Sequence, residues 1–190
     1  LDNINKQRVG VLVGSGIGGL STIEAQIRSL VNKGPNRVAP LTIPMSISNI
    51  ASGAIAIKFG LLGSSFSITS ACASSTHCIG EAYRNIKDGY SDIIFAGGSE
   101  ASICEFGISS FQSLTALSKS EDRNRASIPF DLNRNGFVMG EGAGVLILED
   151  LESALKRGAK IYCEIVGYGT TSDAYHITSP CPDGNGAYRC

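Results

Sequence analysis

A cysteine, Cys72, lies in residues 69–75, where an extended segment runs into small residues that can begin a helix. A helix start is the positive end of the helix dipole, which favours the nucleophilic thiolate over the thiol. The small neighbours would let a large substrate approach the sulfur, and backbone N–H groups could receive the oxyanion of an attacked thioester or ester. The pattern predicts a nucleophile, and the residues alone leave a buried structural thiol as the alternative.

A second motif, residues 14–19, has the spacing G-x-G-x-x-G between a predicted strand at 8–13 and a predicted helix at 20–31. A dinucleotide site also needs an acidic residue about 20 positions further on. Residues 33–40 contain no acidic residue. We therefore favour the alternative, in which the glycines allow a tight turn beside another segment.

The remaining histidines and cysteines do not form a recognisable site. The six cysteines include no C-x-x-C pair and no histidine at zinc-ligand spacing, so neither a metal site nor a redox motif is predicted. His77 follows Cys72 on the same predicted helix, and a structural role is expected for it and for His176. Core packing as free thiols in a reducing compartment is expected for Cys78, Cys104 and Cys163.

Strands and helices alternate along the chain, which predicts one α/β unit with a mostly parallel sheet covered on both faces. Apolar runs predict buried strands at 8–13, 92–96 and 145–148. Further strands are predicted at 63–71 and at 161–166, and in the second of these the side chains alternate between two faces. Helical periodicity predicts helices at 20–31, 46–59, 79–86, 105–114 and 149–157. Cys72 would then lie where a strand passes into a helix.

Composition narrows the class of protein. The 190 residues are 43% hydrophobic and 17% charged, which suits a single globular domain. A net charge of −1 without a basic stripe argues against nucleic acid or an anionic membrane surface as partner. No apolar run reaches the about 18 residues of a membrane span, and the N-terminus lacks a signal-peptide pattern, so a soluble protein is expected. The first residue is not Met and no closing element precedes Cys190, which indicates a fragment.

Five segments, in order and spacing, resemble those of the β-ketoacyl-acyl carrier protein synthases, particularly the type II enzyme of dissociated fatty-acid synthesis. They are residues 69–74 (TSACAS), 96–100 (AGGSE), 129–131 (PFD), 135–144 (NGFVMGEGAG) and 172–176 (SDAYH). The similarity runs over essentially the whole chain. It implies a thiolase-like fold, in which two similar α/β halves form a layered α/β/α/β/α sandwich. Residues 1–166 would be most of the N-terminal half without its first strands, and 167–190 the start of the link to the C-terminal half.

The resemblance also implies roles for particular residues. Cys72 would take the growing acyl chain as a thioester. The acyl pocket would be lined or gated by Ile17 and Phe111. The phosphopantetheine arm would pass Thr178 and Ser179. A position that meets the acidic carrier protein is occupied by Arg37, whereas Thr115 stands where a second basic residue is often found.

The implied reaction is a decarboxylative Claisen condensation of an acyl thioester on Cys72 with malonyl-acyl carrier protein. It needs no metal or redox cofactor, since the substrates arrive on the phosphopantetheine of acyl carrier protein. The family completes catalysis with two histidines and a lysine of its C-terminal half, so the chain alone is expected to be inactive. A homodimer is implied, in a bacterial cytoplasm or in an organellar stroma or matrix.

Three other functions are weighed against this one. A polyketide ketosynthase shares the motifs and differs in the acyl group that it accepts. A non-catalytic partner subunit, like the chain-length factors, keeps the fold without the nucleophile, and Cys72 argues against it. A nucleotide-binding oxidoreductase would rest on the glycine motif alone.

Overall fold

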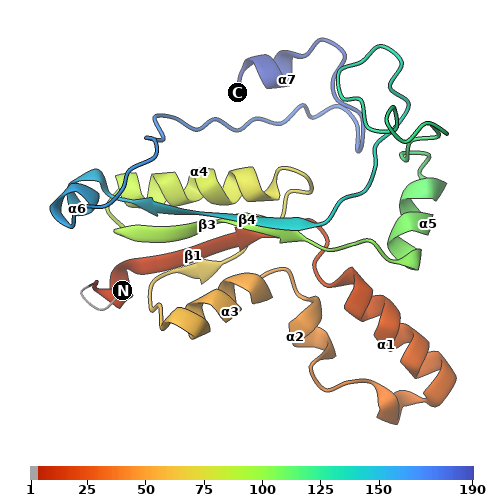
Figure 1. Ribbon diagram of the computed structural model, residues 1–190, viewed down its shortest axis with the longest axis horizontal. Helices are drawn as coiled ribbons and strands as arrows, with labels where there is room; N and C mark the ends of the chain where they lie inside the picture. The colour runs from red at the N-terminus through yellow and green to blue at the C-terminus, as the bar shows by residue number, and fades with distance from the viewer. Residues whose placement is uncertain (1–3) are drawn as a thin grey trace.

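The computed structural model describes residues 4–190 and contains a four-stranded sheet (Figure 1). Its strands are β1 (Val9–Gly14), β2 (Ser65–Phe66), β3 (Ile93–Glu100) and β4 (Gly142–Glu149), in the order β2-β1-β3-β4. Strand β1 pairs in parallel with β2 and β3, whereas β3 and β4 are antiparallel. The predicted α/β sheet is confirmed, with two parallel pairs and one antiparallel pair.

Helices cover both faces of this sheet, with α4 on one side and α3 on the other (Figure 1). The helices are α1 (Leu20–Lys33), α2 (Thr42–Ser46), α3 (Ile50–Phe59), α4 (Ser74–Lys87), α5 (Glu105–Ser113), α6 (Leu151–Lys156) and α7 (Asn185–Tyr188), with 3₁₀ turns η1 (Lys6–Arg8) and η2 (Pro35–Arg37). None of the helices in the described part of the chain is long and apolar enough to cross a bilayer.

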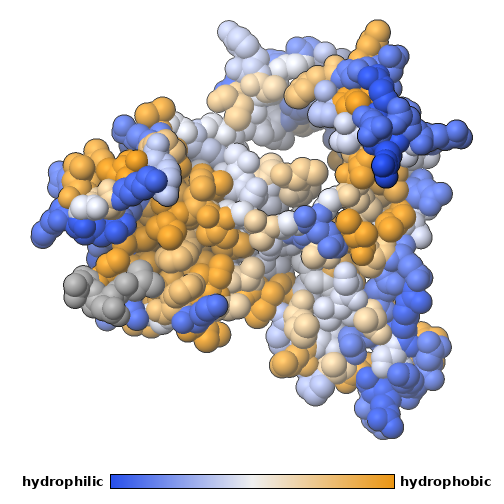
Figure 2. Space-filling view, viewed as in Figure 1, coloured by the Kyte–Doolittle hydropathy of each residue, from blue (hydrophilic) through white to orange (hydrophobic). Residues whose placement is uncertain are grey.

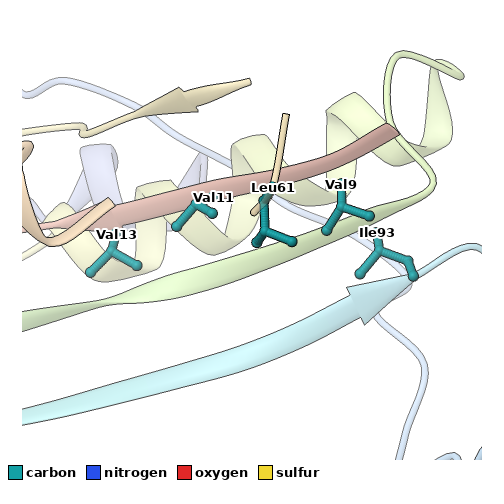
Figure 3. Packing of buried hydrophobic residues seen from close by; sticks show 5 residues of the cluster. All are labelled: Val9, Val11, Val13, Leu61 and Ile93. Atoms are coloured by element: carbon teal, nitrogen blue, oxygen red, sulfur yellow. The ribbon is translucent and has the colours of Figure 1, made fainter. Parts of the chain in front are cut away.

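Strand β1 is the centre of the core because both of its faces are buried. Alternate side chains of a strand point to opposite faces, and one set forms a cluster with Leu61 and Ile93 against helix α3; its β1 members are Val9, Val11 and Val13 (Figure 3). The other face carries Leu12, which packs with residues of β3 and α4. Full burial of such a side chain contributes about 1.5–3 kcal/mol, so β1 is fixed from both sides.

Ser52 of α3 ties the end of β1 to β2. Its fully buried hydroxyl accepts a hydrogen bond from the Val13 N–H and donates one to the Phe66 carbonyl, each at 2.9 Å. The hydroxyl therefore gives the buried Val13 N–H its acceptor and links it to the Phe66 carbonyl of β2.

Replacing this serine should destabilise the protein. Ser52→Ala leaves the Val13 N–H without its acceptor, and we expect the free energy of unfolding to fall by about 1–3 kcal/mol. Urea denaturation measures the change, with Ser109→Ala as the matched control because Ser109 is an exposed serine of α5. Equal stability of the two variants would contradict the role given to Ser52.

Two predicted segments differ in length from the observed elements. The predicted helix at 46–59 begins only at Ile50, because the Ser46 carbonyl accepts a hydrogen bond from the Gly19 N–H at 3.0 Å and α2 ends there. The predicted strand at 63–71 pairs only through Ser65 and Phe66, the two residues of β2. The first difference comes from a contact with the segment that follows β1, and beyond β2 the Thr69 hydroxyl donates to the Ser15 carbonyl of that same segment at 3.1 Å.

The predicted strand at 161–166 is wrong, since these residues have no regular secondary structure. A strand requires a partner for its backbone hydrogen bonds, and none pairs with it within residues 4–190. Cys163, expected in the core, is consequently exposed.

Strand β4 was predicted to be buried and is largely exposed instead. Val145, Leu146 and Ile147 keep 41%, 52% and 60% of their surface accessible. The core clusters lie over β1 and β3, and of the described residues of β4 only Leu148 packs against one of them, so most of this edge strand is left uncovered. Figure 2 shows a large apolar area left of centre, in the region where Figure 1 draws the sheet.

Candidate active site

The site lies at the carboxyl ends of the parallel strands, which is where α/β sheets bind their ligands. Residues 14–19, called the glycine loop from here on, contain the end of β1 and lead into α1. Residues 69–73, called the nucleophile turn, lie between β2 and α4. Strand β3 ends at Glu100. The parallel pairing of β1 with both β2 and β3 brings these three segments to one edge of the sheet.

Cys72 is exposed in the nucleophile turn, two residues before the first residue of α4. The preceding Ala71 has φ +51°, in the left-handed region that non-glycine residues rarely adopt. The turn is closed by hydrogen bonds from the Ala73 N–H to the Ser70 carbonyl and from the Ser74 N–H to the Ala71 carbonyl, both 3.1 Å. Within residues 4–190 Cys72 is therefore not a buried core thiol, and the strained turn places it beside the start of α4.

Two side chains of α4 reach back to hold this turn. The Ser74 hydroxyl donates to the Ala71 carbonyl at 2.6 Å and accepts from the Ser70 N–H at 2.9 Å. The Ser70 hydroxyl shares a hydrogen bond with Nδ1 of His77 at 2.6 Å. The sequence predicted only an unspecified structural role for His77 and no role in the turn for the two serines, because neither serine occupies the N-cap position of α4, which is Ala73.

The Glu100 carboxylate binds the glycine loop. One oxygen accepts from the Ser15 hydroxyl at 3.0 Å, and the other from the N–H groups of Gly16 at 2.7 Å and Ile17 at 3.3 Å. In a dinucleotide-binding loop such N–H groups would receive phosphate. Here they face a carboxylate of the protein itself, so the structure disfavours the nucleotide-binding alternative.

Glycines allow these segments to pack closely, as the sequence predicted for the glycine loop. A methyl group on Gly16 would lie 2.8 Å from a Glu100 oxygen and 3.3 Å from the Ala71 carbonyl oxygen. On Gly98 of β3 it would lie 2.6 Å from Cβ of Ser75. The glycine loop therefore lies directly against the nucleophile turn, and larger residues at these positions would displace the turn.

The neighbouring cysteine, Cys78, is a different kind of thiol. It is fully buried in the cluster with Leu12 and Ala82, as predicted. Burial raises the pKa of the Cys78 thiol, which keeps it protonated and unreactive. Cys104 is partly buried, and its sulfur accepts a hydrogen bond from the Gly107 N–H at the start of α5.

Of the other predicted site residues, only Ile17 lies in a segment that packs against the nucleophile turn; its side chain is 42% exposed. Phe111 of α5 contacts Phe137 edge-on, with ring centroids 5.3 Å apart. Thr178 and Ser179 donate their N–H groups to Nδ1 of His176, at 3.2 and 3.1 Å. These contacts do not reach Cys72, so the four assignments to the acyl pocket and the phosphopantetheine arm stay predictions.

The predicted carrier-protein contact, Arg37, lies exposed in η2 after helix α1. Its carbonyl accepts a hydrogen bond from the Ser29 hydroxyl at 2.9 Å, which fixes the backbone at this corner. The guanidinium is on the surface, where a partner could reach it. Its role also stays a prediction.

A cavity of about 420 Å³ borders the glycine loop. Helices α2 and α3 and the facing ends of β3 and β4 form its other walls; Met45, Ile50 and Glu141 are among the residues that line it. Ile17, Phe111 and Cys72 are not. Residues 4–190 contain no cluster of side chains that could hold a metal ion.

The chain has recognisable relatives. Residues 1–154 match the family model described as "Beta-ketoacyl synthase, N-terminal domain". The chain is 51% identical over 190 residues to 3-oxoacyl-(acyl-carrier-protein) synthase 2 of Synechocystis sp., and 50% identical over 182 residues to that of Staphylococcus aureus. These matches cover 100% and 96% of this chain, but 46% and 45% of the relatives.

Solved structures show the same relationship. One is described as "type II PKS acyl-carrier protein in complex with its ketosynthase bound to the hexaketide"; it superposes with a TM-score of 0.93 at 36% identity, over 100% of this chain and 48% of that one. A β-ketoacyl synthase from Burkholderia phymatum gives a TM-score of 0.83 at 33% identity, over 96% and 45%.

The chain belongs to the β-ketoacyl synthase family, and the residues matched are those of its N-terminal domain. The predicted family and thiolase-like fold are confirmed. The chain spans about half the length of the curated relatives that it matches. The division at residue 166 stays a prediction.

Proposed function

We propose that the protein containing this chain is a β-ketoacyl-acyl carrier protein synthase that elongates fatty acids. The observation that carries the proposal is the exposed Cys72 on a strained turn at the start of α4. A nucleophile held in this way suits acyl transfer through a thioester. The relatives of about 50% identity, named 3-oxoacyl-acyl-carrier-protein synthases, support this reading of the site.

The proposed reaction has two stages. The Cys72 thiolate attacks the carbonyl of an acyl thioester, and the carrier leaves as its thiolate, which takes up a proton from water. Malonyl thioester then loses carbon dioxide, and the carbanion at its C2 attacks the Cys72 thioester and expels the thiolate. The product is a 3-oxoacyl thioester two carbons longer. By the resemblance, two histidines of the family's C-terminal half assist the decarboxylation, and a lysine of the same half completes the catalytic set.

The substrates would be delivered by acyl carrier protein. The structural relative that is described as a ketosynthase in complex with its acyl-carrier protein supports this partner. Arg37, exposed in η2, is the residue of this chain proposed to meet the acidic carrier. The reaction would need no metal or redox cofactor of its own. The protein is also proposed to form a homodimer and to act in a bacterial cytoplasm or in an organellar stroma or matrix.

Product analysis tests the activity. The full-length protein is incubated with acyl- and malonyl-acyl carrier protein, and mass spectrometry follows the thioester on the carrier. We expect a 3-oxoacyl product and one carbon dioxide per condensation. Acyl-carrier protein that remains unextended, with malonyl thioester intact, would refute the assignment.

A polyketide ketosynthase is the second candidate, because the structure with a TM-score of 0.93 is described as a type II polyketide ketosynthase. The same assay distinguishes the two functions when no ketoreductase is present. A fatty-acid enzyme should stop after one condensation, whereas a polyketide enzyme should add further units to the unreduced 3-oxo chain. A chain-length-factor-like subunit would form no product, and the exposed Cys72 argues against it.

A further inference from the structure

Residues 160–180 form an extended segment without regular structure, the first part of which runs alongside helix α4 (Figure 1). Their side chains are exposed except for Ile165 and Tyr168, which are half-buried. The Tyr168 ring lies on Gly80, where any side chain would overlap it. The guanidinium carbon of Arg84, which is also on α4, lies 4.8 Å from the centroid of the Tyr168 ring. This is a cation–π contact. Tyr168 therefore anchors this segment to the helix.

The same ring contacts the residue that holds the nucleophile turn. The rings of Tyr168 and His77 meet edge-on, with centroids 6.2 Å apart and an interplanar angle of 75°. On its other side, His77 shares the 2.6 Å hydrogen bond with the Ser70 hydroxyl. One imidazole thus links a segment about 100 residues away in the chain to the residue two positions before Cys72.

We propose that Tyr168, His77 and Ser70 form a positioning relay, in which docking of residues 160–180 on α4 fixes the turn that presents Cys72. The proposal rests on the assignment of Cys72 as the acyl-accepting nucleophile. A non-glycine residue in the left-handed region, here Ala71, persists only where its surroundings enforce it. The Ser70–His77 hydrogen bond supplies such a constraint, and the Tyr168 ring limits the movement of the imidazole. The three residues position Cys72 and do not touch the reacting atoms.

Alkylation of Cys72 tests the relay without relying on the condensation. The full-length protein is treated with iodoacetamide, and peptide mass spectrometry gives the rate at Cys72 in each variant relative to the wild type. We expect Ser70→Ala and His77→Ala to slow alkylation of Cys72 by about tenfold, since a relaxed turn would no longer fix the cysteine beside the start of α4. Tyr168→Ala should slow it about three- to fivefold, and Tyr168→Phe should not, because the ring makes the contact.

Conservative variants separate positioning from general destabilisation. Ser70→Thr keeps the hydroxyl, and His77→Asn keeps a polar group close to the place of Nδ1, so both should restore at least half of the wild-type rate. Tyr168→Ala combined with His77→Ala should be no slower than His77→Ala alone, because residues of one relay are not additive. In acyl transfer, kcat should fall with KM unchanged.

Wild-type alkylation of Cys72 in both Ser70→Ala and His77→Ala would overturn the proposal. The proposal would also be overturned if the alkylation rate of the Tyr168→Ala and His77→Ala double variant fell by the product of the two single losses. If His77→Ala does not fold, Ser70→Ala and Tyr168→Ala decide the same question. If the alkylation rates follow the prediction but no 3-oxoacyl product is formed, the relay stands and the proposed function fails.

Discussion

Cys72→Ala should abolish formation of the acyl-enzyme and of the 3-oxoacyl product. In the proposed reaction the sulfur forms the covalent bond. The only other nucleophiles in the nucleophile turn are the hydroxyls of Thr69 and Ser70, and both are hydrogen-bonded, Thr69 to the Ser15 carbonyl at 3.1 Å and Ser70 to His77. We expect a loss of at least about 10³-fold in acyl transfer, since losing a catalytic nucleophile has effects of this size or larger. Mass spectrometry of the protein after incubation with acyl-acyl carrier protein measures it.

The Cys72→Ala substitution should leave the fold intact. Because Cys72 is exposed, the free energy of unfolding should change by no more than about 0.5 kcal/mol. Cys163→Ala is the matched control, since Cys163 is also exposed and lies outside the nucleophile turn; it should transfer acyl groups at the wild-type rate. An active Cys72→Ala variant would refute the nucleophile.

Glu100→Ala should reduce both activity and stability. Without the carboxylate, the N–H groups of Gly16 and Ile17 and the Ser15 hydroxyl lose their acceptor. Hydrogen bonds to a charged group contribute about 1.5–3 kcal/mol each, and water can replace some of them here, so we expect unfolding to become easier by about 3 kcal/mol. Urea denaturation measures this change.

The effect on activity should be larger than stability alone explains. The glycine loop lies against the Ala71 carbonyl, so its release should move the nucleophile turn and lower kcat by about 10²-fold. Glu100→Gln keeps one acceptor oxygen and should lie between wild type and Glu100→Ala. Glu121→Ala removes an exposed loop carboxylate and should change nothing. A fully active Glu100→Ala variant would show that the loop does not support the turn.

The Glu100 carboxylate shows that the function of a short sequence motif depends on which residues lie next to it in the folded chain. The spacing G-x-G-x-x-G describes a backbone that can turn sharply and expose N–H groups, and the glycine loop does both. What those N–H groups bind is decided by Glu100, which is 84 residues from Gly16 in the chain. A negative side chain in that place excludes a second negative group by charge repulsion.

The sequence by itself determined the features that depend on local order. Apolar runs located β1 and β3, helical spacing located α1 and α4, and residues 69–75 placed Cys72 between a strand and a helix. These signals are reliable because side-chain periodicity and helix starts involve neighbouring residues. The five matching segments identified the family by the same kind of local evidence.

Only the tertiary structure decided what depends on distant partners. Residues 161–166 have the alternation of a strand, but a strand forms only where another strand accepts its hydrogen bonds. The bonds of Glu100 to the glycine loop join residues 83 to 85 positions apart, and Tyr168 meets His77 across a similar separation. Periodicity carries no information about such pairs, because the path of the chain brings them together. Cys72 could therefore be found from the sequence, whereas the groups that hold its turn could not.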